Sequence, residues 1–170
     1  IVVEDDFLGH VSKDRSLQNH IYFLLVVGEP FRKFKEDEEF RHRWHVNEAL
    51  AKKVEEALRK LYSNLKNEDL LPESEMVSKF LGHLQDISEK YKNQEVIKRW
   101  LQISKIIGKN QLGDWGVMSS PNIKTKGMRD YAFLVIRKHG SPIHFREVAK
   151  QIGTMFNKKA HIATTHNELI

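Results

Sequence analysis

The chain has 170 residues, of which 28 are Lys or Arg and 23 are Asp or Glu, so its formal net charge is +5. It contains no cysteine, which excludes a disulfide scaffold and a thiolate zinc site and favours a reducing cytoplasm. No apolar run approaches the roughly 20 residues that span a bilayer, and the N-terminus lacks the basic-then-apolar order of a signal peptide. The length suits one compact domain or a few small modules.

The positive charge is concentrated at the C-terminal end of the chain. From Ser119 onward there are nine Lys and Arg against three Asp and Glu, a net charge of +6. Residues 1–118 carry 19 basic and 20 acidic residues, a net charge of −1. This asymmetry predicts that only the last part of the chain meets an anionic partner.

Residues 1–48 predict a short helix followed by a long hairpin. The helix covers residues 3–11. Residues 20–27 are rich in β-branched, aromatic and aliphatic side chains, which is typical of a strand, and residues 39–46 alternate apolar and polar side chains as a second strand does. Joined by the charged residues 32–38, the two strands would form a hairpin wing. We interpret residues 1–48 as a partial winged-helix module whose opening helix is missing.

Residues 49–118 predict a middle, winged-helix-like module of three helices. The first begins after Asn47, its expected N-cap, and runs to about Lys66. The second follows Leu71-Pro72-Glu73, with proline in its first turn. The third covers roughly residues 94–107, and the turn-rich stretch after it predicts a very short wing.

Residues 119–170 predict a helix-turn-helix made of three helices. The first covers residues 127–139, where apolar residues at three- and four-residue spacing mark one buried face. Gly140 is its expected C-cap, and Pro142 blocks its continuation into the next helix. The third covers roughly residues 160–170, and in a helix-turn-helix this last helix enters the DNA major groove.

A short repeat supports a tandem arrangement of modules. Phe7-Leu8-Gly9-His10 and Phe80-Leu81-Gly82-His83 are identical tetrapeptides, and Val148-Ala149-Lys150-Gln151-Ile152 fills the equivalent position in a third copy. The spacing near seventy residues and the shared order of elements favour three winged-helix modules in tandem. The predicted fold class is therefore mainly α with small β-hairpin wings. One irregular helical domain with a hairpin is the alternative that remains open.

The C-terminal third also carries a family resemblance. The stretches that match are Gly140-Ser141-Pro142-Ile143-His144-Phe145-Arg146-Glu147-Val148-Ala149, Lys158-Lys159-Ala160-His161 and His166-Asn167-Glu168-Leu169-Ile170. They resemble the HARE-type helix-turn-helix, a winged-helix module of the bacterial RNA polymerase delta subunit, of chromatin-associated proteins and of some restriction systems. Residues 115–130 resemble the segment before that module in bacterial proteins with a sigma-factor-like DNA-binding region. The family continues past the third helix into a β-hairpin wing, so the resemblance implies a module that is truncated at Ile170.

Basic and polar residues around the last helix are the candidate DNA contacts. Lys158 and Lys159 precede it, where side chains and free backbone amides would meet phosphate. The exposed face of the helix is expected to read base edges, and basic residues near the first helix widen the footprint. The candidates are Lys158, Lys159, His161, Thr164, Thr165, Asn167, Lys124, Lys126 and Arg129. For each lysine an ordinary solvated surface is the alternative, and His144 is expected to cap or pack the second helix.

The sequence offers no pattern for a metal site or an active site. His42 and His45 would point to opposite faces of a strand, and His161 and His166 are poorly spaced on a helix. There is no glycine-rich phosphate loop, nucleophile elbow or carboxylate cluster of a nuclease. We therefore expect no cofactor, no metal, no small-molecule substrate, no membrane partner and no enzymatic activity.

Two functions remain as hypotheses. The first is a sigma-factor-like, transcription-associated protein of the bacterial cytoplasm, associated with the nucleoid, that contacts double-stranded DNA through its basic helix-turn-helix. The second is a non-catalytic interaction module that docks on RNA polymerase through the first hairpin and the middle module. Burial of Lys158, Lys159 and the Thr164 face would favour the second hypothesis, because no surface would then be left for a DNA backbone. A third idea, an accessory domain of a larger nuclease, rests on the family resemblance alone.

Overall fold

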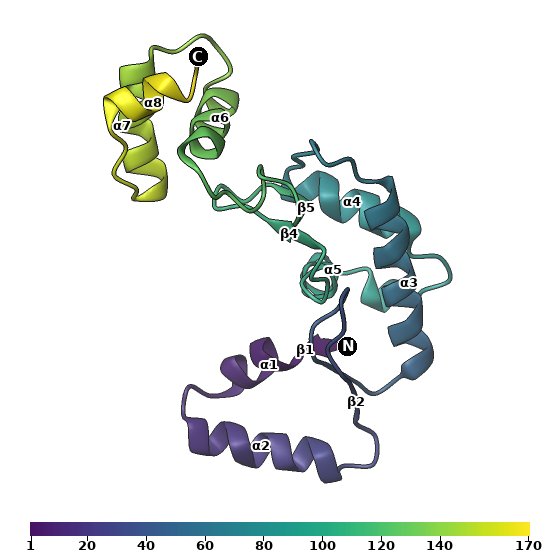
Figure 1. The fold of residues 1–170 in the computed structure, drawn as a ribbon. Helices are drawn as coiled ribbons and strands as arrows, with labels where there is room; N and C mark the ends of the chain where they lie inside the picture. Colours follow the sequence, from purple (N-terminus) through teal and green to yellow (C-terminus); the bar gives the residue numbers. More distant parts are fainter. The chain divides into compact units, whose positions relative to one another are not determined.

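A computed structural model describes residues 1–170 (Figure 1). The chain is mainly helical, with one three-stranded and one two-stranded sheet, so the expected helix-and-hairpin fold class is confirmed at this level. It packs as two compact units. Unit 1 comprises residues 1–65 and 73–108, and unit 2 comprises residues 66–72 and 109–170. None of the helices combines the length and the apolar character of a membrane-crossing segment.

Unit 1 begins with a small antiparallel sheet and two helices. The sheet order is β1-β3-β2, with Val2 and Lys33 both paired to Trp44. Three further helices and a 3₁₀ turn follow. The elements are β1 Val2–Val3, α1 Glu4–Val11, α2 Arg15–Val27, β2 Arg32–Phe34, β3 Arg43–His45, α3 Glu48–Asn64, α4 Glu73–His83, η1 Glu89–Tyr91, α5 Gln94–Leu101 and the start of β4 Ile107–Lys109.

The predicted strand over residues 20–27 is wrong, because this stretch is the C-terminal half of helix α2. Asp14 caps the helix: its Oδ1 accepts the N–H of Ser16 at 3.0 Å. A continuous apolar run fits a strand and a helix equally well, so the cap decides the conformation here. The hairpin partner of β3 is therefore β2, not residues 20–27.

Helices α3, α4 and α5 enclose the core of unit 1. The predicted cap is confirmed, since Oδ1 of Asn47 accepts the N–H of Leu50 at 2.9 Å and opens α3. Helix α5 stops at Leu101, short of the predicted end at 107. The reason is Ser104, whose hydroxyl oxygen accepts the N–H groups of Ile106 and Ile107 and holds a turn. The fully buried side chains include Phe40, Val54, Leu58, Leu61, Met76, Phe80, Ile97, Leu101 and Ile103.

Unit 2 is a three-helix cluster with short extended segments before it. Its elements are β5 Trp115–Val117, α6 Met128–His139, α7 Phe145–Phe156 and α8 Ile162–Asn167. The predicted C-cap of α6 is confirmed, because Gly140 adopts the left-handed conformation with φ +72°. The α8 helix has only six residues, so it is shorter than the predicted helix over 160–170. The core consists of Leu70, Ile123, Tyr131, Ala132, Leu134, Val135, Val148, Ile152 and Phe156.

The two units do not coincide with the three predicted modules, 1–48, 49–118 and 119–170. The first predicted module and most of the second share unit 1, whereas residues 66–72 and 109–118 of the second belong to unit 2. Within unit 1, Arg43 of β3 donates a hydrogen bond from its Nε to Oε1 of Glu55 in α3 at 2.7 Å. An isolated bridge between Phe40 and Ser104 also joins them. Their packing therefore makes residues 1–65 and 73–108 one structural body.

Candidate nucleic-acid interface

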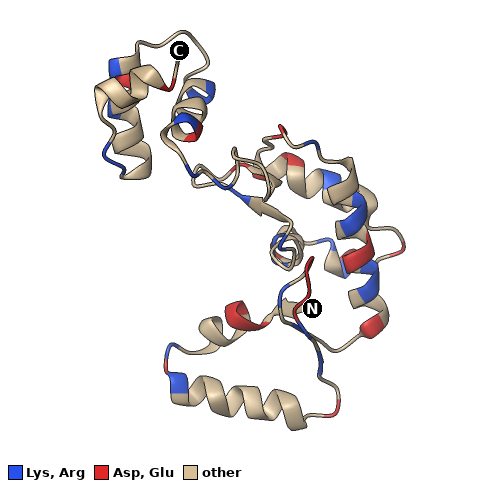
Figure 2. Cartoon of the chain, viewed as in Figure 1, with Lys and Arg blue, Asp and Glu red and all other residues tan.

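The net charge of the chain resides in unit 2. This unit carries eleven Lys and Arg against six Asp and Glu, a net charge of +5, whereas unit 1 carries seventeen of each. Figure 2 shows the positions of Lys and Arg in unit 2 in blue on α6, on α7 and on the loop before α8. An anionic partner is therefore attracted to unit 2 and meets no net charge on unit 1.

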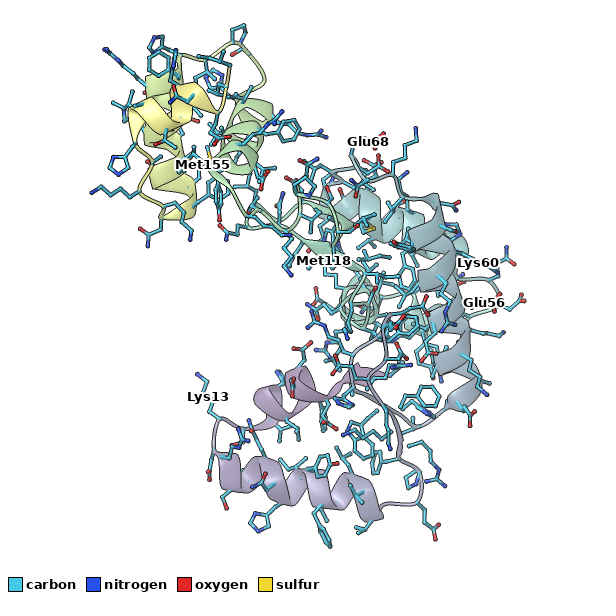
Figure 3. All side chains as sticks on the ribbon, in the orientation of Figure 1. Lys13, Glu56, Lys60, Glu68, Met118 and Met155 are labelled. Carbon is cyan, nitrogen blue, oxygen red and sulfur yellow. The ribbon has the colours of Figure 1, made fainter.

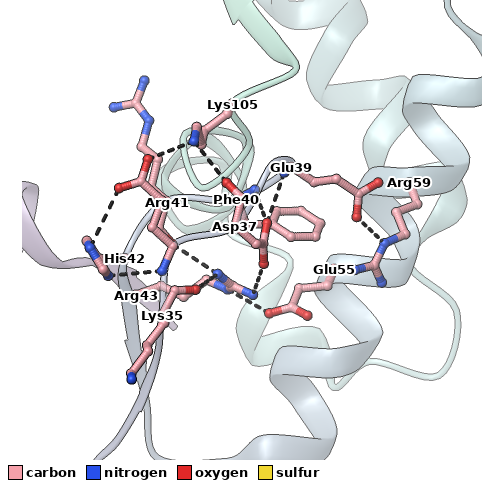
Figure 4. Close-up of polar contacts among 11 residues, drawn as sticks. Lys35, Asp37, Glu39, Phe40, Arg41, His42, Arg43, Glu55, Arg59 and Lys105 are labelled. Carbon is pink, nitrogen blue, oxygen red and sulfur yellow. Dashed lines mark hydrogen bonds and ion pairs between the residues drawn. The ribbon is translucent and has the colours of Figure 1, made fainter.

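About half of the cations of unit 1, nine of seventeen, are in ion pairs with carboxylates of the same unit. Arg43 is buried and pairs with Glu55 and Asp37, and Lys105 pairs with Glu36 at 2.7 Å (Figure 4). Other pairs lie on the outer surface of α3, where Glu56 and Lys60 project together (Figure 3). The basic residues of unit 1 in ion pairs are Lys33, Arg43, Lys52, Arg59, Lys60, Lys79, Lys92, Lys98 and Lys105.

Most cations of unit 2 have no carboxylate partner. The carboxylate of Asp130 accepts the backbone N–H groups of Lys126 and Gly127 at 2.8 and 3.0 Å, so it caps α6 rather than pairing with a side chain. Glu147 lies 3.8 Å from Lys150. Nine of the eleven basic residues have no ion pair: Lys66, Lys124, Lys126, Arg129, Arg137, Lys138, Arg146, Lys158 and Lys159. Their charge is available to an external anion.

The predicted contacts around the last helix lie on the surface, with one exception. Lys158 and Lys159 are exposed in the loop between α7 and α8, which starts at Asn157 in the left-handed conformation with φ +51°. His161, Thr164 and Asn167 are also exposed. The prediction is wrong for Thr165, which is fully buried and donates its hydroxyl to the carbonyl of His161 at 3.0 Å. A hydroxyl committed in this way cannot reach a base edge.

The predicted residues near the first helix of unit 2 are exposed as well. Lys124 and Lys126 lie in the segment that leads into α6, and Arg129 is in its first turn. Together with the loop before α8, they give unit 2 two basic regions on different elements. No side chain of this set is buried, so each can approach a phosphate without a desolvation cost.

Sequence reasoning missed an aromatic residue within this basic surface. Phe133 is 43% exposed and stands one helical turn from Arg129 and one from Arg137 on α6. The three line a groove of about 400 Å³ together with Ile136, Glu168 and Leu169. The spacing of i, i+4 and i+8 is visible in the sequence and is the signal that places Phe133 on the same face as the two arginines. An aromatic ring between two guanidinium groups can stack on a base while the cations meet phosphates.

His144 has the structural role expected of it. Its Nδ1 accepts the N–H of Arg146 at 3.3 Å, so it caps α7. Its ring packs on Phe145 with 4.3 Å between centroids, and Phe145 in turn meets the ring of His166 edge-on at 4.8 Å. These contacts join the start of α7 to α8 and fix the helix that carries Thr164 and Asn167.

The candidate interface is thus a surface of unpaired cations on a three-helix support. It can neutralise an extended polyanion, because its charges are distributed over α6, α7 and the loops before α6 and α8. Comparison with known proteins returns no matching family model, no matching curated protein and no matching solved structure.

Proposed function

We propose that this chain is a transcription-associated, sigma-factor-like DNA-binding protein whose unit 2 binds double-stranded DNA as a helix-turn-helix of the tandem winged-helix type. The observation that carries the proposal is the absence of ion-pair partners for nine of the eleven cations of unit 2. Free surface cations supply most of the affinity of a protein for DNA, because they displace counterions condensed on the phosphates. The site of action is then the bacterial nucleoid.

The contacts divide between the backbone and the bases. Lys158 and Lys159 meet phosphates from the loop before α8, and Lys124, Lys126 and Arg129 extend the phosphate contacts along the duplex. His161, Thr164 and Asn167 are the exposed polar residues that approach base edges in the major groove. Phosphate contacts set the position of unit 2 on the duplex, and the three polar residues set its preference for sequence.

Fluorescence anisotropy with a labelled duplex of about 20 bp tests this proposal at several salt concentrations. The double variant Lys158→Glu with Lys159→Glu is expected to bind at least about tenfold more weakly than the unaltered chain. The matched control is Lys52→Glu with Lys60→Glu, since both residues are exposed on α3 and already have carboxylate partners. This control should bind as the unaltered chain does. Equal affinities for all three proteins would overturn the proposal.

The exposure of Lys158, Lys159 and Thr164 supports DNA over the alternative of docking on RNA polymerase. The two alternatives separate in one further measurement. A docking module would retain polymerase in a pull-down at high salt and would not shift a duplex at low salt, whereas a DNA-binding module would do the reverse.

A further inference from the structure

Helix α2 exposes an apolar surface that the rest of unit 1 does not cover. Leu25 is its only buried residue. In the last two turns, residues 21–27 are all apolar or aromatic, and a helix that is apolar on every side is normally enclosed by protein. The exposed fractions are 47% for Leu17, 62% for Phe23, 61% for Leu24, 56% for Val26 and 56% for Val27.

One side of α2 is fixed to unit 1, and this defines the side that is free. The main contacts of the helix are with α1 and β2 (Figure 1). Tyr22 meets Trp44 edge-on at 5.9 Å between ring centroids, on the same side as Leu25. The opposite side carries Leu17, Leu24 and Val27, with His20 among them, at alternating spacings of three and four residues. That spacing is the seam of a helix pair.

We propose that α2 packs antiparallel against α2 of a second copy of this chain. The two helices would be related by a two-fold axis, so that the same surface of each copy meets itself.

The charges at the two ends of α2 are self-complementary in this arrangement. Lys13 and Arg15 lie at its N-terminal end, and Figure 3 shows Lys13 projecting away from the ribbon there. Glu29 lies just beyond its C-terminal end. None of the three has an ion pair within the chain. An antiparallel pair brings Arg15 of one copy beside Glu29 of the other, twice.

This pairing of Arg15 with Glu29 also fixes the register. With these two residues opposite each other, Leu17 of one copy faces Val27 of the second copy. His20 then faces Leu24 in the same way. Each apolar residue of the seam therefore meets the seam of the other helix rather than solvent.

The area suits a weak dimer. The exposed parts of Leu17, Leu24 and Val27 and of the flanking Phe23 sum to roughly 400–500 Å² on each copy, given about 150–250 Å² for a whole aromatic side chain. Two copies then bury roughly 800–1,000 Å², which approaches the lower limit of about 1,000 Å² for a specific interface. The patch is contiguous, unlike singly scattered surface residues, which need no partner.

The charges around α2 argue for a second copy over an anionic lipid surface. Helices that lie on such membranes carry a polar face rich in Lys and Arg, whereas α2 contains one basic residue, Arg15. The neighbouring α1 exposes Asp5 and Asp6, which anionic headgroups would repel.

Sedimentation equilibrium of the full chain across a concentration series tests the proposal. A reversible monomer–dimer equilibrium is expected, and Leu24→Glu is expected to weaken it by at least about a hundredfold because a carboxylate would be buried in the seam. Val46→Glu is the matched control, since Val46 is 67% exposed in unit 1 but lies off α2. It should dimerise as the unaltered chain does. Circular dichroism of each variant confirms that it is folded. If the chain stayed monomeric up to about 100 μM, the proposal would be overturned, because this concentration lies far above the Kd of ordinary specific complexes. An equal loss of dimer affinity in Leu24→Glu and Val46→Glu would overturn it as well.

Cysteine cross-linking tests the register, because the chain has no native cysteine. The double variant Leu17→Cys with Val27→Cys should form intermolecular disulfides, since these positions face each other between copies. The two positions are about 15 Å apart along one helix, which is too far for a disulfide within a copy. Neither single variant should cross-link. Cross-linking of Leu17→Cys with itself would indicate a parallel pair and overturn the antiparallel arrangement. If the unaltered chain bound lipid vesicles without dimerising, the partner of α2 would be a membrane surface and not a second copy.

Discussion

Arg43 is a buried cation at the centre of a polar cluster in unit 1. Its side chain is 4% exposed, and its guanidinium donates to Oε1 of Glu55 at 2.7 Å and to the carbonyls of Lys35 and Arg41 at 3.2 and 3.0 Å. Phe34 and Phe40 cover it, with 5.2 and 4.9 Å between the guanidinium carbon and each ring centroid. Desolvation makes this charge costly unless a carboxylate stays beside it.

The substitution Glu55→Gln is therefore expected to destabilise unit 1 by about 3 kcal/mol, because it leaves the buried guanidinium without its main counter-charge. The free energy of unfolding from urea titration measures the effect. The adjacent substitution Glu56→Gln is the matched control, since the pair between Glu56 and Lys60 is exposed and contributes little. If both variants unfolded at the same urea concentration, Glu55 would have no special role.

A second buried polar residue, His45, makes the stability of unit 1 depend on pH. Its ring is 4% exposed, packs on Phe34 with 4.2 Å between centroids, and has no hydrogen-bond partner at either nitrogen. Burial lowers the pKa of His45, and Arg43 and the N-terminal amine act in the same direction, against Glu48 and Glu55. The folded chain therefore binds this proton less readily than the unfolded chain, whose histidine titrates near pH 6.5.

Linkage gives the sign of the effect. The stability contributed by neutral His45 is complete above about pH 6.5 and is lost as pH falls below that value, because the unfolded state takes up the proton first. Urea unfolding at several pH values should show the free energy of unfolding falling on acidification, and His45→Phe should reduce that slope. His10→Gln, an exposed histidine of the same unit, should leave the slope unchanged. A slope unaltered in His45→Phe would contradict the role of this residue.

At the scale of elements, the helices that the sequence predicts well are those with a clear boundary and a clear period. Asn47 marks the start of α3 and Gly140 the end of α6, and both act through local backbone geometry that sequence alone specifies. Helix α2 was mistaken for a strand because its apolar run has no period. Its exposure was equally invisible, since an apolar run normally signals burial.

Two glycines, Gly140 at the C-cap of α6 and Gly153 inside α7, provide a matched pair of substitutions for testing the stability of unit 2. Gly140 has φ +72°, where a side chain is strained although no atom crowds its Cβ position, so Gly140→Ala should destabilise the unit by about 1 kcal/mol. Gly153 lies inside α7, and an alanine Cβ there would meet only the carbonyl of Lys158 at 3.7 Å. Gly153→Ala should therefore stabilise α7 by about 0.5–1 kcal/mol.

Amide hydrogen exchange in α6 and α7 of the full chain measures both changes. Exchange should become faster in Gly140→Ala and slower in Gly153→Ala. If Gly140→Ala slowed exchange, the left-handed cap of α6 would not be an essential feature of the fold.

The sequence predicted only some residues of the candidate interface correctly. Lys158 and Lys159 were predicted because they precede the last helix, and both are exposed, since loop lysines are seldom buried. Thr165 was assigned to the wrong face, because a six-residue helix gives too few turns to determine which side packs inward. Phe133 was missed since exposure of one aromatic residue depends on packing that the sequence does not specify.

At the scale of the whole molecule, composition reveals the charge asymmetry but not its meaning. Counting residues shows a basic C-terminal region, whereas only the structure shows that nine of the seventeen cations of unit 1 are in ion pairs and that nine of the eleven cations of unit 2 are not. Ion pairing between residues such as Arg59 and Glu39, twenty positions apart, requires the fold.

This asymmetry sets how DNA affinity should depend on salt. Each phosphate contact contributes about −0.9 to the slope of log K against log salt concentration, so nine unpaired cations limit the slope to about −8. Substituting glutamine for both Lys124 and Lys126 should make the slope less steep by about 2, because two contacts are removed without adding a repulsive charge.

The same substitution at Lys79 and Lys92, which are exposed and paired in unit 1, should leave the slope unchanged. Duplex binding measured between low and physiological salt would give both slopes. A change of equal size in the two variants would mean that phosphate contacts are spread over both units, and the assignment of the interface to unit 2 would then be incorrect.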